Sequence, residues 1–97
     1  MMRKYELVSI IDATLPQEER EKINKEAAEA ITRSGGKVIN SKVWLEKQKF
    51  TFRIKKVNEG TYYLTNFEIG ASVISDIQQR LRLNERILRF AIIRNED

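Results

Sequence analysis

The fold is decided by the stretch VNEGTYYLTNFEI, residues 57–69. Its first four residues include Asn58 and Gly60, which favour a turn. From Thr61 onward β-branched and aromatic side chains predominate, and they predict a strand over residues 61–69. Residues 38–54, on the other side of the turn, also have the composition of a strand. The two segments therefore predict a β-hairpin with its turn at residues 57–60.

The strand before this turn is predicted to be irregular. Val43 and Leu45 occupy odd positions, whereas Phe50 and Phe52 occupy even positions. Because side chains alternate between the two faces of a strand, the change of phase near residues 46–48 predicts a bulge or a bend. The single tryptophan, Trp44, is expected to be a packing anchor.

On the C-terminal side of the hairpin, the sequence predicts a helix and a final strand. Gly70 and Ser72 lead into the helix, and Asn84 is expected to end it. Residues 87–93 are mostly apolar and predict the last strand. The helix has an apolar side that consists of Val73, Ile74, Ile77 and Leu81.

On the N-terminal side, residues 5–11 predict a strand with little alternation, as expected of a central strand covered on both faces. Thr14 and Gln17 have the spacing of a capping box, and Pro16 falls in the first turn of the helix that follows. Gly35-Gly36 is expected to end that helix, because glycine readily adopts the left-handed conformation. The apolar stripe of the helix is Ile23, Ala27, Ala30 and Ile31.

The predicted order of elements is therefore β-α-β-β-α-β, in one domain that spans residues 1–97. Two right-handed crossovers place both helices on one face of the sheet. The fold class is α+β: a ferredoxin-like sandwich of a four-stranded antiparallel sheet and two helices. The first and third strands are expected in the middle of the sheet.

Because helices cover one face only, the other face of the sheet is a candidate binding surface. We assign the Phe67 side of the third strand to the core, and the remaining residues of the central strands are still apolar. A contiguous apolar patch on an open sheet face more often marks a partner site than plain surface. The alternatives are a homodimer through this face, or loops that fold over it. The predicted protein-partner face is Val8, Ile10, Tyr62, Leu64, Ala91 and Ile93, with Glu6, Arg53 and Arg89 at its rim.

The net charge of +4 is unevenly distributed. Between residues 33 and 56 eight basic residues are opposed only by Glu46, and between residues 80 and 94 five arginines are opposed only by Glu85. Such segregation favours a polyanionic partner. We expect the basic side chains to contact nucleic-acid phosphates more than bases. The predicted RNA-binding residues, with RNA implied by the family resemblance described below, are Arg3, Lys47, Lys49, Arg53, Arg80, Arg82, Arg86 and Arg89.

Catalysis is not expected. The chain has no cysteine and no histidine, which removes the usual general base near neutral pH and the commonest metal ligand. Glycine-rich phosphate loops and the common hydrolase motifs are also absent. We therefore predict no enzyme activity, no cofactor, no metal site and no small-molecule substrate. No apolar run approaches the roughly 20 residues of a membrane helix, and the start lacks the pattern of a signal peptide.

The leading alternative is an RNA-recognition module that binds single-stranded RNA. The run from Glu59 to Phe67 partly matches the aromatic strand signature of that module, but the basic-glycine-aromatic opening is replaced by Glu59-Gly60-Thr61. A third class is a regulatory or catalytic ferredoxin-like domain. An acylphosphatase-like enzyme would need a phosphate cradle in the first loop, where Asp12 places an acid.

Three segments resemble the bacterial small-subunit ribosomal protein S6 family. They are the opening Met2-Arg3-Lys4-Tyr5-Glu6, the strand GTYYLTNFE at residues 60–68, and LRLNERILR at residues 81–89, which is the most specific. Residues 47–54 depart from the family, because its glycine is replaced by Leu45-Glu46 and its proline by Arg53. The resemblance implies a ferredoxin-like fold, a heterodimer with ribosomal protein S18, binding to the central domain of 16S ribosomal RNA, and a cytoplasmic location on the ribosome.

Overall fold

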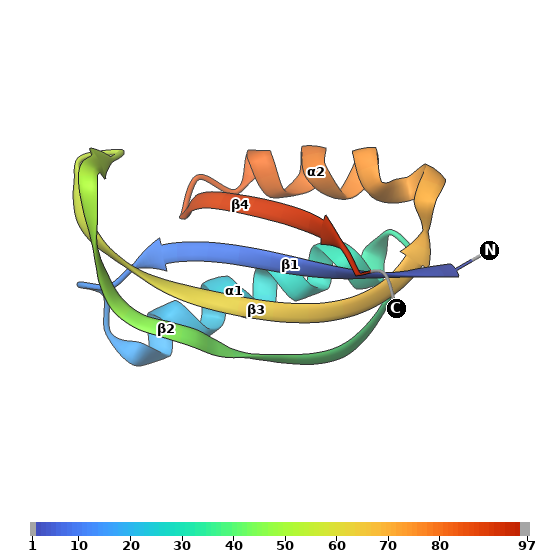
Figure 1. The fold of residues 1–97 in the computed structure, drawn as a ribbon, viewed down its shortest axis with the longest axis horizontal. Helices are drawn as coiled ribbons and strands as arrows, with labels where there is room; N and C mark the ends of the chain where they lie inside the picture. The colour runs from blue at the N-terminus through green and yellow to red at the C-terminus, as the bar shows by residue number, and fades with distance from the viewer. Residues whose placement is uncertain (1, 96–97) are drawn as a thin grey trace.

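Four antiparallel strands form one sheet in the order β2-β3-β1-β4 (Figure 1). The protein is seen here in a computed structural model that describes residues 2–95. The predicted order β-α-β-β-α-β and the ferredoxin-like fold class are confirmed. In chain order the elements are β1 (Met2–Asp12), α1 (Gln17–Arg33), β2 (Lys37–Ile54), β3 (Val57–Gly70), a 3-10 turn η1 (Ala71–Val73), α2 (Ile74–Leu83) and β4 (Ile87–Arg94).

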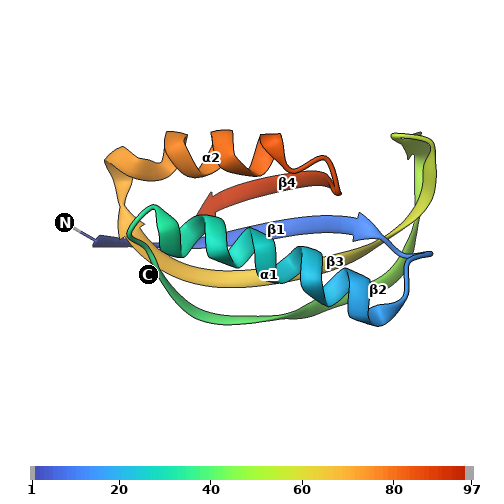
Figure 2. The ribbon, with the colours of Figure 1, turned by 180° about the vertical axis from the view of Figure 1, so that it is seen from behind.

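Both helices lie on the same face of the sheet. Seen from behind, α1 crosses in front of the strands and α2 lies alongside it above β4, and in the opposite view the sheet is in front of α1 (Figures 1 and 2). Residues of both helices pack into the same core against β1 and β3. β1 and β3 are the two inner strands, as expected. The molecule therefore has two layers, and one face of the sheet is left without helices.

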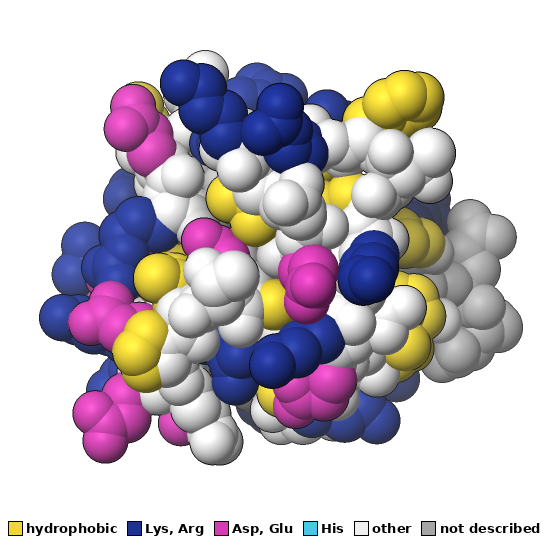
Figure 3. All heavy atoms as spheres, turned by 90° about the vertical axis from the view of Figure 1, so that its left-hand side faces the viewer, with side chains coloured by type: hydrophobic (Ala, Val, Ile, Leu, Met, Phe, Trp, Pro, Cys, Tyr) yellow, Lys and Arg dark blue, Asp and Glu magenta, His cyan; other side chains and the backbone are white. Residues whose placement is uncertain are grey.

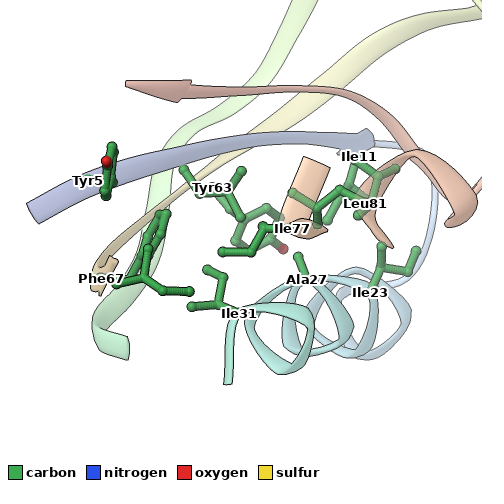
Figure 4. Packing of buried hydrophobic residues seen from close by; sticks show 12 residues of the cluster. Tyr5, Ile11, Ile23, Ala27, Ile31, Tyr63, Phe67, Ile77 and Leu81 are labelled. Carbon is green, nitrogen blue, oxygen red and sulfur yellow. The ribbon is translucent and has the colours of Figure 1, made fainter. Parts of the chain in front are cut away.

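The core lies between the helices and every second residue of the inner strands. Phe67 is completely buried, and its ring stacks on that of Tyr5 with a centroid distance of 5.6 Å (Figure 4). The assignment of the Phe67 side of β3 to the core is thus confirmed. The other buried apolar residues of this cluster are Leu7, Ile11, Ile23, Ala27, Ile31, Tyr63, Ile69, Ile77, Leu81 and Ile87.

The start of α1 differs from the predicted capping box. Thr14 donates both its backbone N–H and its hydroxyl to Oδ1 of Asp12, at 2.9 and 2.7 Å, and the amide of Gln17 donates to Glu21. Pro16 occupies the N-cap position, so it precedes the first turn instead of lying within it. Asp12 prevails because an aspartate readily accepts from the residue two positions later. The predicted helix end is confirmed, with Gly35 at φ +91°.

The β2–β3 turn also differs from the prediction. It lies at Lys55 and Lys56, which have φ values of +50° and +67°, as in a two-residue hairpin turn with both central residues left-handed. Asn58 and Gly60 lie within β3 instead. The predicted irregularity of β2 is confirmed, because the pairing with β3 shifts between Leu45 and Gln48 and again beyond Lys49.

The end of this hairpin extends past the rest of the sheet. The last pair between β1 and β3 joins Asp12 to Gly60, and residues 49–59 continue beyond it. We term residues 49–59 the hairpin arm. In Figure 1 it curls upward at the left, at the end of the sheet where β4 begins.

Gly60 lies at the base of the arm, where a side chain would have no room. A Cβ atom at this position would lie 2.4 Å from Cζ of Phe50 and 2.6 Å from Cγ2 of Ile10. Gly60→Ala is therefore expected to lower the free energy of unfolding by about 1–3 kcal/mol, the usual cost of overpacking. Urea denaturation measures this cost.

The matched control for this substitution is the same change in a Phe50→Ala background. There Gly60→Ala should cost clearly less, because the nearest atom has been removed. An equal cost in the two backgrounds would mean that the Phe50 ring does not restrict position 60.

Candidate protein and RNA interfaces

The face of the sheet opposite the helices, which we term the open face, carries all six predicted partner-face residues. Their neighbours along each strand point into the core, and strand side chains alternate. Val8, Ile10, Tyr62 and Leu64 are half-buried, whereas Ala91 and Ile93 are exposed. Cross-strand pairing from β3 through β1 to β4 forms three rows: Leu64–Val8–Ala91, Tyr62–Ile10–Arg89 and Asn66–Glu6–Ile93.

Two aromatic residues of β2 extend this apolar surface, and sequence reasoning missed both. Trp44 is 52% exposed, so it is no core anchor, and its ring meets Tyr62 edge-on at a centroid distance of 6.3 Å. Phe50 covers Gly60 beside Ile10. Bulges in β2 decide which way these rings point, and the phase change in the apolar pattern was the only signal of them.

The polar border of the open face differs in part from the prediction. Glu6 pairs across the sheet with Ile93, and Arg89 pairs with Ile10, so both lie next to the apolar residues. Lys42 pairs with Leu64 and joins the border from β2. Arg53 does not belong to it, because it lies in the hairpin arm, beyond the four-stranded part of the sheet.

The eight predicted RNA-binding residues are exposed, but they lie in separate places. Arg3 lies near the start of β1, at the opposite end of the sheet from the arm. The others divide between β2 with its arm (Lys47, Lys49, Arg53) and the region of α2 and β4 (Arg80, Arg82, Arg86, Arg89). The view onto the end that carries the arm shows Lys and Arg side chains at its top and along its left side, with acidic side chains interspersed among them (Figure 3).

Among the eight predicted RNA-binding residues, Arg86 alone forms ion pairs with other described residues. Its guanidinium lies 2.7 Å from Oε2 of Glu19 and 3.6 Å from Oε2 of Glu26, which joins the α2–β4 loop to α1. Asn84 strengthens this junction by donating to Glu26 at 2.9 Å. The positive charge of Arg86 is therefore partly neutralised, and Arg86 is less available to a phosphate than the other seven residues.

Side chains that bind metal ions are not clustered in the described part of the chain. The described residues contain no group of three or more acidic, histidine or cysteine side chains that could bind a metal ion. Burial raises the pKa of the Tyr63 phenol above its ordinary value of 10.0, and a hydrogen bond from Arg20 offsets part of this rise. Tyr63 is therefore protonated at neutral pH and acts as a core residue.

No described helix is long and apolar enough to cross a membrane.

Comparisons with known proteins point to one family along nearly the whole chain. The family model described as ribosomal protein S6 matches residues 4–94. The small ribosomal subunit protein bS6 of Fusobacterium nucleatum is 30% identical over 95 residues, which cover 98% of this chain and 100% of that protein. The bS6 protein of Micrococcus luteus is 36% identical over 96 residues, which cover 99% of this chain and 94% of that protein.

A comparison with solved structures also finds a ribosomal protein S6. The 30S ribosomal protein S6 of Thermotoga maritima is similar to this chain with a TM-score of 0.84 and 29% sequence identity. The match covers 98% of this chain and 89% of that one.

Proposed function

Because the chain belongs to the ribosomal protein S6 family of the small subunit, we propose that it binds the central domain of 16S ribosomal RNA as a heterodimer with ribosomal protein S18. The open face takes the protein partner, and the unpaired basic residues take the RNA. The observation that carries this proposal is the continuous apolar surface on the open face of the sheet, bordered by charge.

The family accounts for the remaining predictions about function. Its members are structural proteins of the small ribosomal subunit, so the prediction that the chain is not an enzyme is confirmed. The same membership assigns the chain to the ribosome in the cytoplasm. It also favours the ribosomal function over the RNA-recognition module that was the leading alternative.

The partner part of the proposal is supported by the composition of the open face. Water-facing strands usually alternate to polar residues, whereas here Val8, Ile10 and Leu64 adjoin one another across β1 and β3. Trp44 and Tyr62 add aromatic area, which is typical of residues that dominate binding energy. A surface of this kind is suited to apolar contact with a protein.

The RNA part of the proposal is supported by unpaired positive charge. Apart from Arg86, none of the eight predicted RNA-binding residues forms an ion pair with a carboxylate of the described residues. Lysine and arginine on a surface neutralise phosphates and release counterions, and this binding is not specific to sequence. Residues 47–54, which depart from the family pattern, retain basic side chains at Lys47, Lys49 and Arg53.

RNA affinity of the heterodimer is expected to fall steeply as salt rises. Each phosphate-binding residue replaced by alanine, Lys49 for example, should reduce the slope of log K against log salt by about 0.7–0.9. Fluorescence anisotropy with a labelled 16S central-domain fragment measures the slope, and the same titration without S18 tests whether the partner is needed. Tyr62→Ala should change RNA binding less than Lys49→Ala. The opposite ranking, together with a flat salt dependence, would favour base stacking on the sheet.

A further inference from the structure

A groove of about 450 Å³ runs between α2 and β4. Gln78, Leu81 and Arg82 of α2 form one wall, residues 87–92 of β4 form the other, and Lys55 of the hairpin arm completes the lining. In the described part of the chain β4 pairs with β1 alone, so its other edge offers backbone N–H groups that no strand occupies. The groove thus combines basic side chains with backbone donors.

The charge of this groove has one sign. Lys55, Arg82 and Arg89 line it, with the Arg89 side chain directed to the open face beside Ile10, and none of its lining residues is acidic. None of the three forms an ion pair with a described carboxylate. The groove between α1 and α2 is different, because Glu26 and Glu29 lie among its basic residues. Of the two grooves, the one along β4 is therefore complementary to a polyanion.

Lys55 reaches this groove because the hairpin arm curls toward the start of β4 (Figure 1). Its Nζ lies 3.4 Å from the carbonyl oxygens of both Glu85 and Ile87. These contacts are long and their acceptors are neutral, so they hold the amine in place without neutralising its charge. A phosphate oxygen would be the stronger acceptor, since hydrogen bonds between charged groups are shorter and stronger.

The two residues of the turn line different pockets. Lys55 faces the β4 groove, whereas Lys56 lines a pocket with Asp12 and Glu59, two acids. Adjacent lysines of the same turn thus differ in their surroundings, although both have left-handed backbone conformations. Replacing Lys55 or Lys56 by alanine removes the same charge, so a difference between the two variants would report on the groove and not on total charge.

We propose that the groove between α2 and β4 holds a stretch of RNA backbone, and that Lys55 at the tip of the hairpin arm supplies one of its phosphate contacts together with Arg82. The inference rests on the proposed RNA-binding function, which it refines by naming the site and a residue outside the predicted set. It also gives the hairpin arm a role, because the arm adds the cation Lys55 to Arg82 at a site built by α2 and β4.

The test compares wild type, Lys55→Ala, Arg82→Ala and Lys56→Ala in complex with S18, each titrated with the labelled 16S central-domain fragment over a range of salt. Lys55→Ala and Arg82→Ala should each raise Kd and reduce the slope of log K against log salt by about 0.7–0.9. Lys56→Ala removes the same charge one residue away and should leave the slope unchanged. Lys55→Arg keeps the positive charge and should retain the wild-type slope of log K against log salt. Amide NMR shifts of residues 87–92 should move on RNA addition, and thermal unfolding verifies that every variant is folded.

Two outcomes would overturn the assignment while the proposed function stands. In one, wild type binds RNA with a steep salt slope that Lys55→Ala and Arg82→Ala both keep. In the other, Lys56→Ala reduces the slope as much as Lys55→Ala, which would mean that net charge and not the groove is responsible. A wild-type complex that binds no RNA would overturn both the groove and the proposed function.

Discussion

Leu64→Glu is expected to weaken the complex with the protein partner by about 2 kcal/mol or more, as for the loss of a central interface residue. Leu64 lies in the middle row of the open face, opposite Val8. A carboxylate there would be buried without a partner once the complex forms, and that is costly. The fold should tolerate the change, because Leu64 is only half-buried and points away from the core. Isothermal titration calorimetry with S18 measures the binding loss.

The matched control is Leu83→Glu, the same substitution on the other side of the molecule. Leu83 ends α2 and is 82% exposed, so a charge there should leave partner binding unchanged. Both variants should change the free energy of unfolding by about 1 kcal/mol at most. If Leu64→Glu unfolded the domain, or if both variants bound the partner equally well, the open face would not be the partner site.

Phe67→Ala is expected to lower the free energy of unfolding by about 3–5 kcal/mol, the usual cost of removing a large buried aromatic side chain. Phe67 is completely buried, and its loss removes the stack on Tyr5 and leaves a cavity beneath α1 and α2. Domains of this size are commonly stable by about 5–15 kcal/mol, so the change consumes a large share of the total. Urea denaturation followed by circular dichroism measures it.

Asn66, the residue next to Phe67, provides a control for the loss of stability. Asn66 lies on the open face, where its amide donates to Oδ1 of Asn40 at 2.8 Å. Asn66→Ala should cost about 1 kcal/mol or less, because the groups left behind remain accessible to water. Equal losses for Asn66→Ala and Phe67→Ala would contradict the division of β3 into a buried and an open side.

The division of the inner strands into two faces was predictable because strand geometry has a strict period of two. Once Phe67 was assigned to the core, Tyr63 and Thr65 had to follow it, and Tyr62 and Leu64 had to face the other way. The helices were equally predictable, since Ile77 and Leu81 recur at helical spacing and Gly35 marks the end of α1. Local periodicity therefore determined both layers.

Local signals failed where two short-range interactions competed. Thr14 had two possible partners close in sequence, and Asp12 prevailed over the capping arrangement with Gln17. Asn58 and Gly60 favoured a turn, yet Gly60 was needed for the close approach of Phe50 and the turn formed at the two lysines. A local sequence pattern can permit two conformations, and it does not predict which of them packs better in the folded protein.

Contacts between residues far apart in the chain could not be predicted from the sequence. Arg86 was assigned to RNA, but α1 brings Glu19 within 2.7 Å of it, from a position 67 residues earlier in the chain. Lys55 contacts the carbonyl of Ile87, which is 32 positions later in the chain, and no sequence motif predicted this contact. Such pairs depend on how the arm bends and how the layers are offset, which only the complete fold determines.

The strand order also governs when this protein can fold during its own synthesis. β1 is the first strand to be made and β4 the last, yet the two lie side by side. Until residues 87–94 emerge from the exit tunnel, one edge of β1 has no partner and the neighbouring core under α2 stays open. Domains usually fold as units, so closure of the sheet waits for the final strand. A nascent chain that stalls before β4 therefore exposes the apolar edge on which unwanted pairing begins.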